Sequence, residues 1–373
     1  MEILIKILQF VCALSLLVLV HEFGHFMFAK VFKCRVEKFY IFFNLWFSIF
    51  KFKKGDTEYG IGWLPLGGYC KISGMVDESM DTDGLKEEPK PYEFRSKPAW
   101  QRLLIMVGGV LMNVLLAIGI YIGLSWTYGD NYYAVKDVNA AYGFEFSDFA
   151  HEIGFRDGDK ILRVGGQEVE SSQDIIEGIV FDLAESVEVE RDGKIIEIPM
   201  YLQYISEILN DKEFINFHLP MIAADVLPGS GAEAAGIQPG DRLLTLDGQP
   251  LSQYKNRFRL HPEKTLPLTF QRDSAGIMQV LTTMVAIDTA GHIGIQPLPI
   301  LQDIATTHIS YNFIESIPAG FKRAHSEIGK YLKQIRLIGT PETGAYKGVG
   351  GIGTMIKIFP KKWDWFYFWN ITA

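Results

Sequence analysis

Residues 14–28, LSLLVLVHEFGHFMF, place two histidines four residues apart in sequence that is otherwise almost entirely apolar. On an α-helix, residues four apart lie on one face, so His21 and His25 can offer two imidazoles to one metal ion. Glu22 is beside them, where its carboxylate can take a proton from a water on that metal. This H-E-x-x-H pattern predicts a zinc peptidase centre, with His21 and His25 as metal ligands and Glu22 as the catalytic base.

The alternative is a pair of buried histidines that bind no metal. Burying two imidazoles and a carboxylate in an apolar helix costs free energy unless they have a function. A chance H-E-x-x-H motif is expected in about one of a hundred such chains. We therefore favour the metal site and expect Zn²⁺, although iron or cobalt could occupy the same histidines in vitro.

Composition indicates a membrane protein. The chain has 373 residues, of which 48% are hydrophobic, and its net charge of −8 argues against a nucleic-acid partner. The apolar run from Ile3 to Val20, which continues through the histidine motif, and the run Leu103–Tyr128 are each long enough to cross a bilayer. A signal peptide is the alternative for the first run, but no small-residue cleavage site follows it.

Basic residues predict the orientation of these helices. They are frequent between the two apolar runs, whereas Lys6 is the only one near the start of the chain. The positive-inside rule therefore places the Val31–Gln101 segment in the cytoplasm, with everything after Tyr128 outside. The loop Asp77–Glu93 is acidic, and we expect it to be a solvated connection.

The segment between the helices predicts β structure. Phe39–Ile72 is rich in aromatic residues and is broken by a turn signal at Lys54-Gly55-Asp56. Lipid cannot satisfy open strand edges, so this hairpin must pack on protein or lie at the interface. Its edge could accept a substrate as an added strand, and a purely structural hairpin is equally compatible. Asn113, the one amide of the second apolar run, either joins helices or faces a functional cavity.

An internal repeat follows the second apolar run. Residues 154–162, GFRDGDKIL, match residues 236–244, GIQPGDRLL, and each copy continues into a short apolar strand and a turn with glycine. The pattern resembles the PDZ domain, most closely in the second copy. PDZ domains bind peptide C-termini by strand addition. The alternative is that both copies act only as a steric cap.

The last part of the chain is amphipathic and then aromatic. Asn312–Ile338 predicts an amphipathic helix with a basic side. Gly348–Gly353 is a glycine-rich loop that lacks the Lys-Ser/Thr of a P-loop, so we predict no nucleotide site there. The aromatic cluster at 363–369 is typical of an interfacial belt that opens a third membrane segment.

The order of these parts resembles the site-2 protease family of intramembrane zinc metalloproteases, in particular its bacterial regulator-of-sigma-E protease branch. The resemblance rests on HEFGH in an apolar helix, PLGGYCKI after the hairpin, Gly-Gly-x-x-x-Asn in the second helix and the tandem repeats. It implies that His21 and His25 bind Zn²⁺ and that Glu22 is the base. It also implies that the substrate is bound by Gly67, Gly68, Tyr69 and Asn113.

The resemblance implies a multi-pass α-helical membrane protein with a membrane-associated β-hairpin and two extracytoplasmic PDZ-like α+β domains. Such a protein lies in the bacterial inner membrane, with the PDZ-like domains on the periplasmic side. It would cleave single-pass membrane proteins, such as anti-sigma factors or signal-peptide remnants, after a first extracytoplasmic cut, in regulated intramembrane proteolysis. Besides substrates, the expected partners are the lipid bilayer and peptide C-termini at the PDZ-like domains.

We expect seven segments along the chain. The first three are the helix with HEFGH, the cytoplasmic-side hairpin with its acidic loop, and the second membrane helix. Two PDZ-like domains, an amphipathic helix with a glycine-rich connector, and the start of a third membrane segment follow. The expected boundaries of these segments, in order, are 1–30, 31–101, 102–128, 129–208, 209–298, 299–361 and 362–373.

One part of the family pattern is not found in this chain. The family supplies its third zinc ligand as an Asp in Asn-x-x-Pro-x-x-x-Leu-Asp-Gly on a later membrane helix. Asp247 lies in a Leu-Asp-Gly, but Arg242 stands in place of the Pro and the motif falls in the second repeat, so we expect it not to be a ligand. Asp364 lies at the start of the aromatic cluster instead of in an apolar helix. We expect that the chain ends before the helix that carries the ligand.

Three alternatives to a complete peptidase follow from these observations. A membrane-anchored tandem PDZ adaptor without catalytic activity is supported by the missing Asp and opposed by the spacing of the two histidines around Glu22. A truncated, inactive form of the peptidase also stays open, because catalytic zinc sites normally have three protein ligands. A secreted soluble zincin is opposed by the apolar run Leu103–Tyr128.

Overall fold

The computed structural model describes residues 2–65, 67–75, 88–253, 256–274, 276–299, 306–348 and 350–373. Most of the predicted acidic loop lies outside these residues. The chain forms two compact units. The first consists of Met1–Asp130, Ile309–Tyr331 and Val349–Ala373, and the second of Asn131–His308 and Leu332–Gly348.

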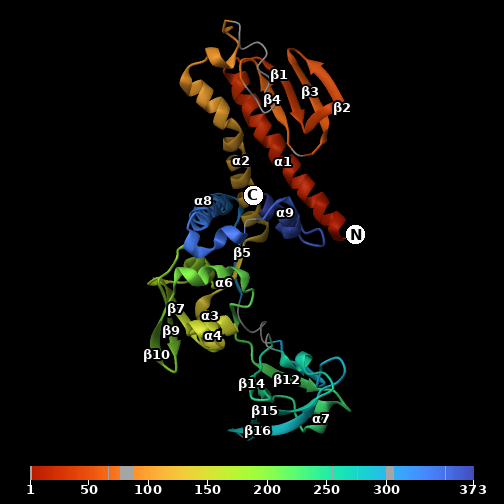
Figure 1. Cartoon of the computed structure of the whole chain (residues 1–373), viewed down its shortest axis with the longest axis vertical. Helices are drawn as coiled ribbons and strands as arrows, with labels where there is room; N and C mark the ends of the chain where they lie inside the picture. The colour runs from red at the N-terminus through yellow and green to blue at the C-terminus, as the bar shows by residue number, and fades with distance from the viewer. Residues whose placement is uncertain are drawn as a thin grey trace. The chain divides into compact units, whose positions relative to one another are not determined.

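Two long helices form the centre of the first unit. They are α1 (Glu2–Val31) and α2 (Ala99–Tyr128), which lie side by side (Figure 1). Each has 30 residues and is therefore about 45 Å long, more than the roughly 30 Å of a hydrocarbon core. Both are long and apolar enough to cross a membrane, and apolar side chains such as Leu4, Leu8 and Val110 are exposed on them.

A four-stranded sheet packs against α1. Its strands are β1 (Val36–Ile41), β2 (Phe43–Lys54), β3 (Thr57–Leu64) and β4 (Tyr69–Ile72), in the order β2-β3-β1-β4. The predicted turn between β2 and β3 is confirmed, and Gly55 takes the positive φ of 60° that this turn requires. The predicted hairpin is thus one side of a larger sheet, in which β1 pairs with β3 in parallel and with β4 in antiparallel orientation.

Buried side chains attach this sheet to the helices. Val36 on β1 and Ile72 on β4 pack with Ala29 of α1 and Ile105 of α2 in one apolar cluster. Because β4 follows Gly68 directly, this cluster holds the chain after Gly68 against α1. Strands β4 and β2 are the two edges of the sheet.

The second unit contains both sequence repeats. The first repeat has the strand order β10-β9-β7-β8 and a separate pair β11-β6, and the second has β16-β15-β13-β12-β17 with β14 on β13. The strands of the first are β6 (Phe144–Phe146), β7 (Lys160–Val164), β8 (Gln167–Glu168), β9 (Ser186–Arg191), β10 (Lys194–Pro199) and β11 (Ile215–Phe217). Those of the second are β12 (Met221–Val226), β13 (Arg242–Leu246), β14 (Gln249–Pro250), β15 (Thr265–Ser274), β16 (Ile277–Ala286) and β17 (Ile295–Pro297).

Short helices complete each repeat. In the first they are α3 (Val135–Ala141), α4 (Asp148–Ile153), α5 (Ser172–Ile176) and α6 (Ile205–Asn210), and in the second α7 (Gly231–Ala234). A wider helical turn, Glu177–Phe181, continues α5.

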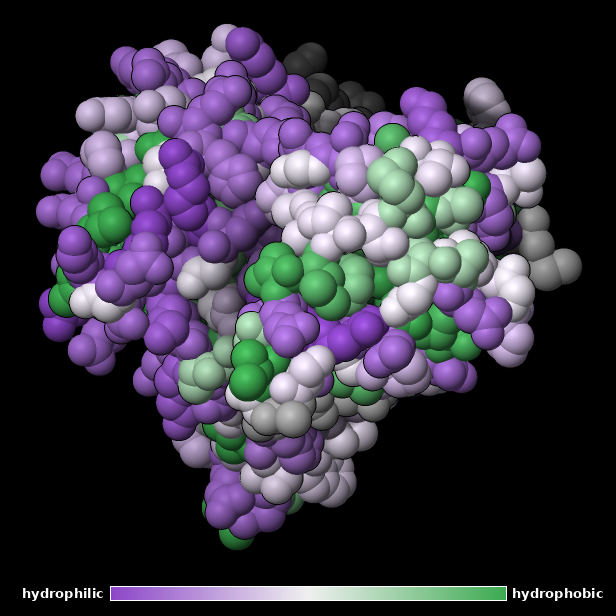
Figure 2. All heavy atoms as spheres, turned by 90° about the horizontal axis from the view of Figure 1, so that it is seen from below, coloured by the Kyte–Doolittle hydropathy of each residue, from purple (hydrophilic) through white to green (hydrophobic). Residues whose placement is uncertain are grey.

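The face drawn in Figure 2 is largely hydrophilic and carries separate hydrophobic patches.

The same buried ion pair occurs in both repeats. Arg191 on β9 donates hydrogen bonds from Nε and Nη2 to the two carboxylate oxygens of Asp159, both at 2.7 Å. Arg272 on β15 binds Asp241 in the same bidentate way, at 2.7 and 2.5 Å. Both aspartates are only 1% exposed. The two segments that match in sequence therefore also match in structure.

Three further helices follow the repeats. The predicted amphipathic helix is confirmed as α8 (Phe313–Ile338), and Asn312 caps it by accepting hydrogen bonds from two backbone N–H groups of its first turn. Helix α9 (Ile352–Ile358) begins inside the predicted glycine-rich loop, so the prediction of a loop up to Gly353 is wrong. The aromatic cluster forms α10 (Trp365–Thr372).

Candidate metal centre

The two motif histidines converge on one point between α1 and α2. Both imidazoles are half-buried, and their Nε2 atoms are 3.2 Å apart. Two nitrogen ligands at 2.0–2.1 Å from a tetrahedral zinc ion are about 3.3–3.4 Å from each other. The spacing of the two nitrogens and their chemistry therefore fit a shared Zn²⁺ ion.

Both imidazoles, which belong to α1, are also contacted by groups of α2. Nδ1 of His25 is 2.7 Å from the backbone carbonyl oxygen of Ile105. A carbonyl oxygen only accepts, so this Nδ1 carries the proton and Nε2 is left with a lone pair for a metal. Nδ2 of Asn113 is 3.4 Å from Nδ1 of His21. The predicted residue Asn113 thus lies against His21, one of the two predicted metal ligands.

Glu22 is brought next to the segment predicted to bind substrate. Its side chain is buried, at 6% exposure. A Cβ atom on Gly68 would lie 3.3 Å from Cγ of Glu22 and 2.8 Å from Val18, so the backbone of Gly68 lies directly on α1. The chain entering β4 therefore lies beside the predicted base.

The neighbours of Gly68 face the sheet instead. The ring of Tyr69 stacks on those of Tyr40 and Phe43, and its hydroxyl donates to Oδ1 of Asn44 at 3.0 Å. Gly67 lies against the Phe43 ring. Of the four residues predicted to bind substrate, Gly68 and Asn113 are beside the motif residues, and Gly67 and Tyr69 contact other strands.

The described residues add no third protein ligand to this centre. Within the described residues there is no group of three or more His, Cys, Asp or Glu that could hold a metal ion. Asp364 caps α10, accepting a hydrogen bond from the backbone N–H of Tyr367 at 3.1 Å. Asp247 lies in the turn between β13 and β14, in the second unit. Both aspartates therefore occupy structural positions.

Two contacts of the centre were not predicted from the sequence. The carbonyl of Ile105 belongs to the backbone, so the residue type at this position does not predict its contact with His25. Gly109 touches the ring of His21. Gly109 is four residues from both Asn113 and Ile105, so the three positions share one helix face. This spacing was the sequence signal that could have placed Gly109 and Ile105 near the site together with Asn113.

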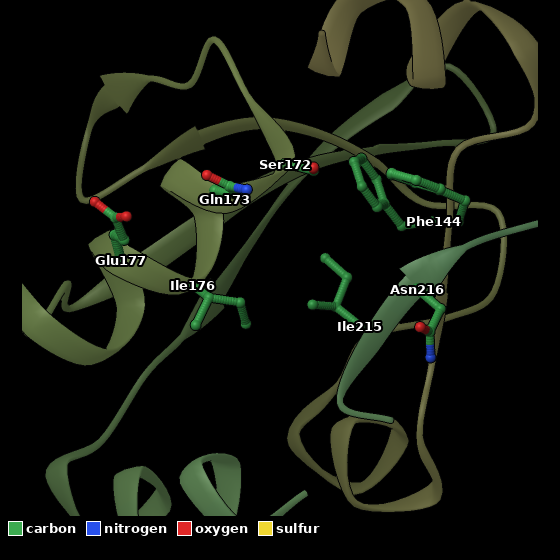
Figure 3. A pocket seen from close by; sticks show the side chains of 8 residues that line it. Phe144, Ser172, Gln173, Ile176, Glu177, Ile215 and Asn216 are labelled. Atoms are coloured by element: carbon green, nitrogen blue, oxygen red, sulfur yellow. The ribbon is translucent and has the colours of Figure 1, made fainter. Parts of the chain in front are cut away.

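A second candidate site is a hollow of about 410 Å³ in the first repeat. It lies between α5 and β11, and Figure 3 shows Ile176 and Ile215 on opposite sides of it. Its lining is mainly apolar, with Ser172 and Asn216 among the polar residues. In the described part of the chain, β11 pairs with β6 alone, so its other edge can take a further strand.

Comparison with known proteins gives a consistent family. The model of peptidase family M50 matches residues 9–373. A Neisseria meningitidis protein with zinc metalloprotease in its name is 32% identical over 315 residues, which cover 79% of this chain and 67% of that protein. A similarly named Borreliella burgdorferi protein is 30% identical, with 65% of this chain and 54% of that protein covered.

A further relative has a more specific name. Protease RseP of Yersinia pestis is 29% identical over 308 residues, with 75% of this chain and 63% of that protein covered. The chain therefore spans between about half and two thirds of the length of these three relatives.

Proposed function

This chain belongs to peptidase family M50, and we propose that it is a zinc metalloendopeptidase whose centre consists of His21, Glu22 and His25. The matches confirm the family and the zinc metalloprotease class predicted from the sequence. The observation that carries the assignment of residues is the 3.2 Å between the two Nε2 atoms, next to a buried carboxylate.

The residues of this centre have separate tasks in peptide hydrolysis. His21 and His25 would hold Zn²⁺, which supplies a Lewis acid that activates water and polarises a carbonyl group. Glu22 accepts the proton of the attacking water and then delivers it to the leaving amide nitrogen. The backbone of Gly68 lies beside the Glu22 side chain, which is buried.

The surroundings of the centre support cleavage within a membrane. Counted from Ile3, His21 lies roughly 27 Å along α1, near the far side of a hydrocarbon core about 30 Å thick. With the basic residues between α1 and α2 in the cytoplasm, the repeats are extracytoplasmic, as in a bacterial inner-membrane protein. Substrates would be single-pass membrane proteins, such as anti-sigma factors or signal-peptide remnants already cut outside.

Strand β4 gives such a substrate a place to bind. A helix hides its amide bonds, so a transmembrane substrate must unwind before it can be cut. Because β4 is an edge of the sheet and follows Gly68, an unwound segment pairing with that edge would pass beside Glu22.

The experiment that tests the catalytic assignment is Glu22→Gln. A general base contributes about 10²–10⁴-fold, so cleavage of a single-pass substrate with a short external part should fall at least about 100-fold. Bound zinc should be unchanged, because the substitution leaves both imidazoles. Glu2→Gln removes an exposed carboxylate from the same helix and should cleave normally. Cleavage by Glu22→Gln at the rate of Glu2→Gln would sink the mechanism.

A second function is supported by the hollow beside β11. We infer that the first repeat is PDZ-like and adds a peptide C-terminus as a strand on β11, with apolar side chains entering between Ile176 and Ile215. The alternative is a steric cap that excludes partners with bulky external domains and binds no peptide.

Peptide binding to the whole chain separates these alternatives. A labelled peptide library with free C-termini should bind, and Ile176→Arg should weaken binding at least about tenfold, since it places a charge in an apolar pocket. Ile195→Arg, at a side chain 69% exposed on β10 of the same repeat, is the matched control. No binding by the unmodified chain would support the steric cap. Peptide binding without zinc would support the adaptor alternative.

A further inference from the structure

We propose that α2 positions both metal-binding imidazoles through three groups on one helix face: the Ile105 carbonyl, the Cα of Gly109 and the Asn113 amide. The proposal rests on the metal centre proposed above. The three positions are four residues apart, so they form one line along α2. Each of them contacts His21 or His25.

The Ile105 carbonyl fixes His25. Its hydrogen bond with Nδ1 is short, at 2.7 Å, and holds the ring in the tautomer whose Nε2 can bind a metal. Ile105 itself is fully buried in the apolar cluster that joins α1, α2 and the sheet. The acceptor is thus on a backbone segment that cannot turn away from His25.

Gly109 fixes the plane of the His21 ring by contact. A Cβ atom on Gly109 would lie 2.6 Å from Nε2 and 2.7 Å from both Cδ2 and Cε1 of that ring. The two helices are already in close contact at this level, because the backbones of Gly24 and Gly108 touch, so little space separates Gly109 from the ring. We therefore expect a side chain at position 109 to displace the His21 ring, whose Nε2 is the proposed metal-binding atom.

Asn113 is the third group, and its amide forms a hydrogen bond with Nδ1 of His21. Its Oδ1 is buried and has no hydrogen-bond partner among the described residues, whereas its Nδ2 is 3.4 Å from Nδ1 of His21. If Nε2 binds a metal, Nδ1 carries the proton and needs an acceptor. With the side-chain amide turned by 180°, Oδ1 accepts a hydrogen bond from Nδ1–H of His21, which also satisfies the buried oxygen. Asn113 is therefore a positioning residue.

The test compares glycine-to-alanine substitutions on one helix. In Gly109→Ala the new methyl group presses on the His21 ring, whereas in Gly119→Ala and Gly123→Ala it meets nothing within 4 Å. Zinc affinity of the full chain, purified in detergent, is measured by competition with a chelating dye. We expect Gly109→Ala to bind zinc at least about tenfold more weakly, as is usual when groups around metal ligands are changed. Both control variants should bind like the unmodified chain.

Asn113 variants give an independent readout. Asn113→Leu removes the acceptor and should weaken zinc binding about tenfold, whereas Asn113→Asp keeps an oxygen and should restore it. The absorption spectrum of bound Co²⁺ should shift in Gly109→Ala and Asn113→Leu and stay unchanged in Gly119→Ala, which a merely structural role would not produce.

The possible outcomes separate the two proposals. Equal zinc affinities for Gly109→Ala and Gly119→Ala, with Asn113→Leu equal to Asn113→Asp, would overturn the role of α2 while leaving the metal centre intact. If zinc binding is absent from the unmodified chain, or survives His21→Ala, the metal centre itself fails and the role of α2 with it.

Discussion

The crossing of α1 and α2 and the pair of repeats fix their geometry by opposite means. At the crossing, glycine backbones touch, and the imidazoles are held by neutral groups. In each repeat, a buried aspartate is held by an arginine with two hydrogen bonds. At the crossing, an added atom should move the imidazoles of the candidate site. In the repeats, the loss of a charge should lower the free energy of unfolding of the domain.

The largest expected effect of this difference is on the repeats. Arg272→Met leaves Asp241, which is 1% exposed, without its guanidinium partner. Removing one partner of a buried pair costs about 3–5 kcal/mol, so the second unit should unfold at markedly lower denaturant concentration. Zinc binding by the first unit should not change.

Limited proteolysis of the second repeat, alongside a zinc titration, measures both effects on one sample. Arg259→Met removes an exposed arginine of the same repeat and serves as the control. A loss of zinc binding in Arg272→Met would break the proposed independence of the two regions.

Removal of the metal should have the reverse effect, destabilising the helix crossing and leaving the repeats unchanged. Ligand at about 100 times its dissociation constant stabilises the binding state by about 2.7 kcal/mol, so chelation should destabilise the helix crossing by an amount of that order. Hydrogen exchange should become faster around His21, while amides of β7 and β13 keep their protection. Faster exchange in both regions would contradict a metal confined to the crossing.

Gly24→Ala should have a smaller effect on stability and a clear one on the site. The new Cβ would collide with the carbonyl of Gly108, which is backbone and cannot rotate away. Overpacking costs about 1–3 kcal/mol, and the displaced helix should also lose zinc affinity. Thermal unfolding and zinc competition measure the two quantities, with Gly123→Ala as the control. An unchanged zinc affinity would show that the helices can separate without disturbing the imidazoles.

The smallest expected effect concerns Cys34, which follows α1. Burial raises the pKa of the Cys34 thiol, although Lys97 opposes this shift. The reactive thiolate is therefore scarcer at a given pH than in an exposed cysteine. Alkylation in the folded chain should be slow at pH 8 and rise only at higher pH, as mass spectrometry would show. Labelling as fast as in the unfolded chain would mean that the Cys34 thiol after α1 is exposed to solvent.

Much of the fold follows from local sequence signals. Apolar runs predicted α1 and α2, Lys54-Gly55-Asp56 predicted a turn, and the match of 154–162 with 236–244 predicted two related segments. The parallel pairing of β1 with β3 was not predicted, because it joins strands across the β2–β3 hairpin and depends on packing against α1.

The candidate site was predictable only where side chains carry the chemistry. H-E-x-x-H gave the two imidazoles and the carboxylate, and the structure places both Nε2 atoms together. The Ile105 carbonyl and the contact of Gly109 with His21 depend on how the helices cross, and a backbone atom or a missing side chain has no sequence pattern of its own.

Zinc binding by the full chain in detergent, compared with His21→Ala and His25→Ala, tests the metal centre most directly. We predict one zinc ion per unmodified chain and at least a tenfold loss of affinity in each variant, with both repeats still folded. Zinc bound equally well by His25→Ala and by the unmodified chain would contradict a metal held between these two imidazoles.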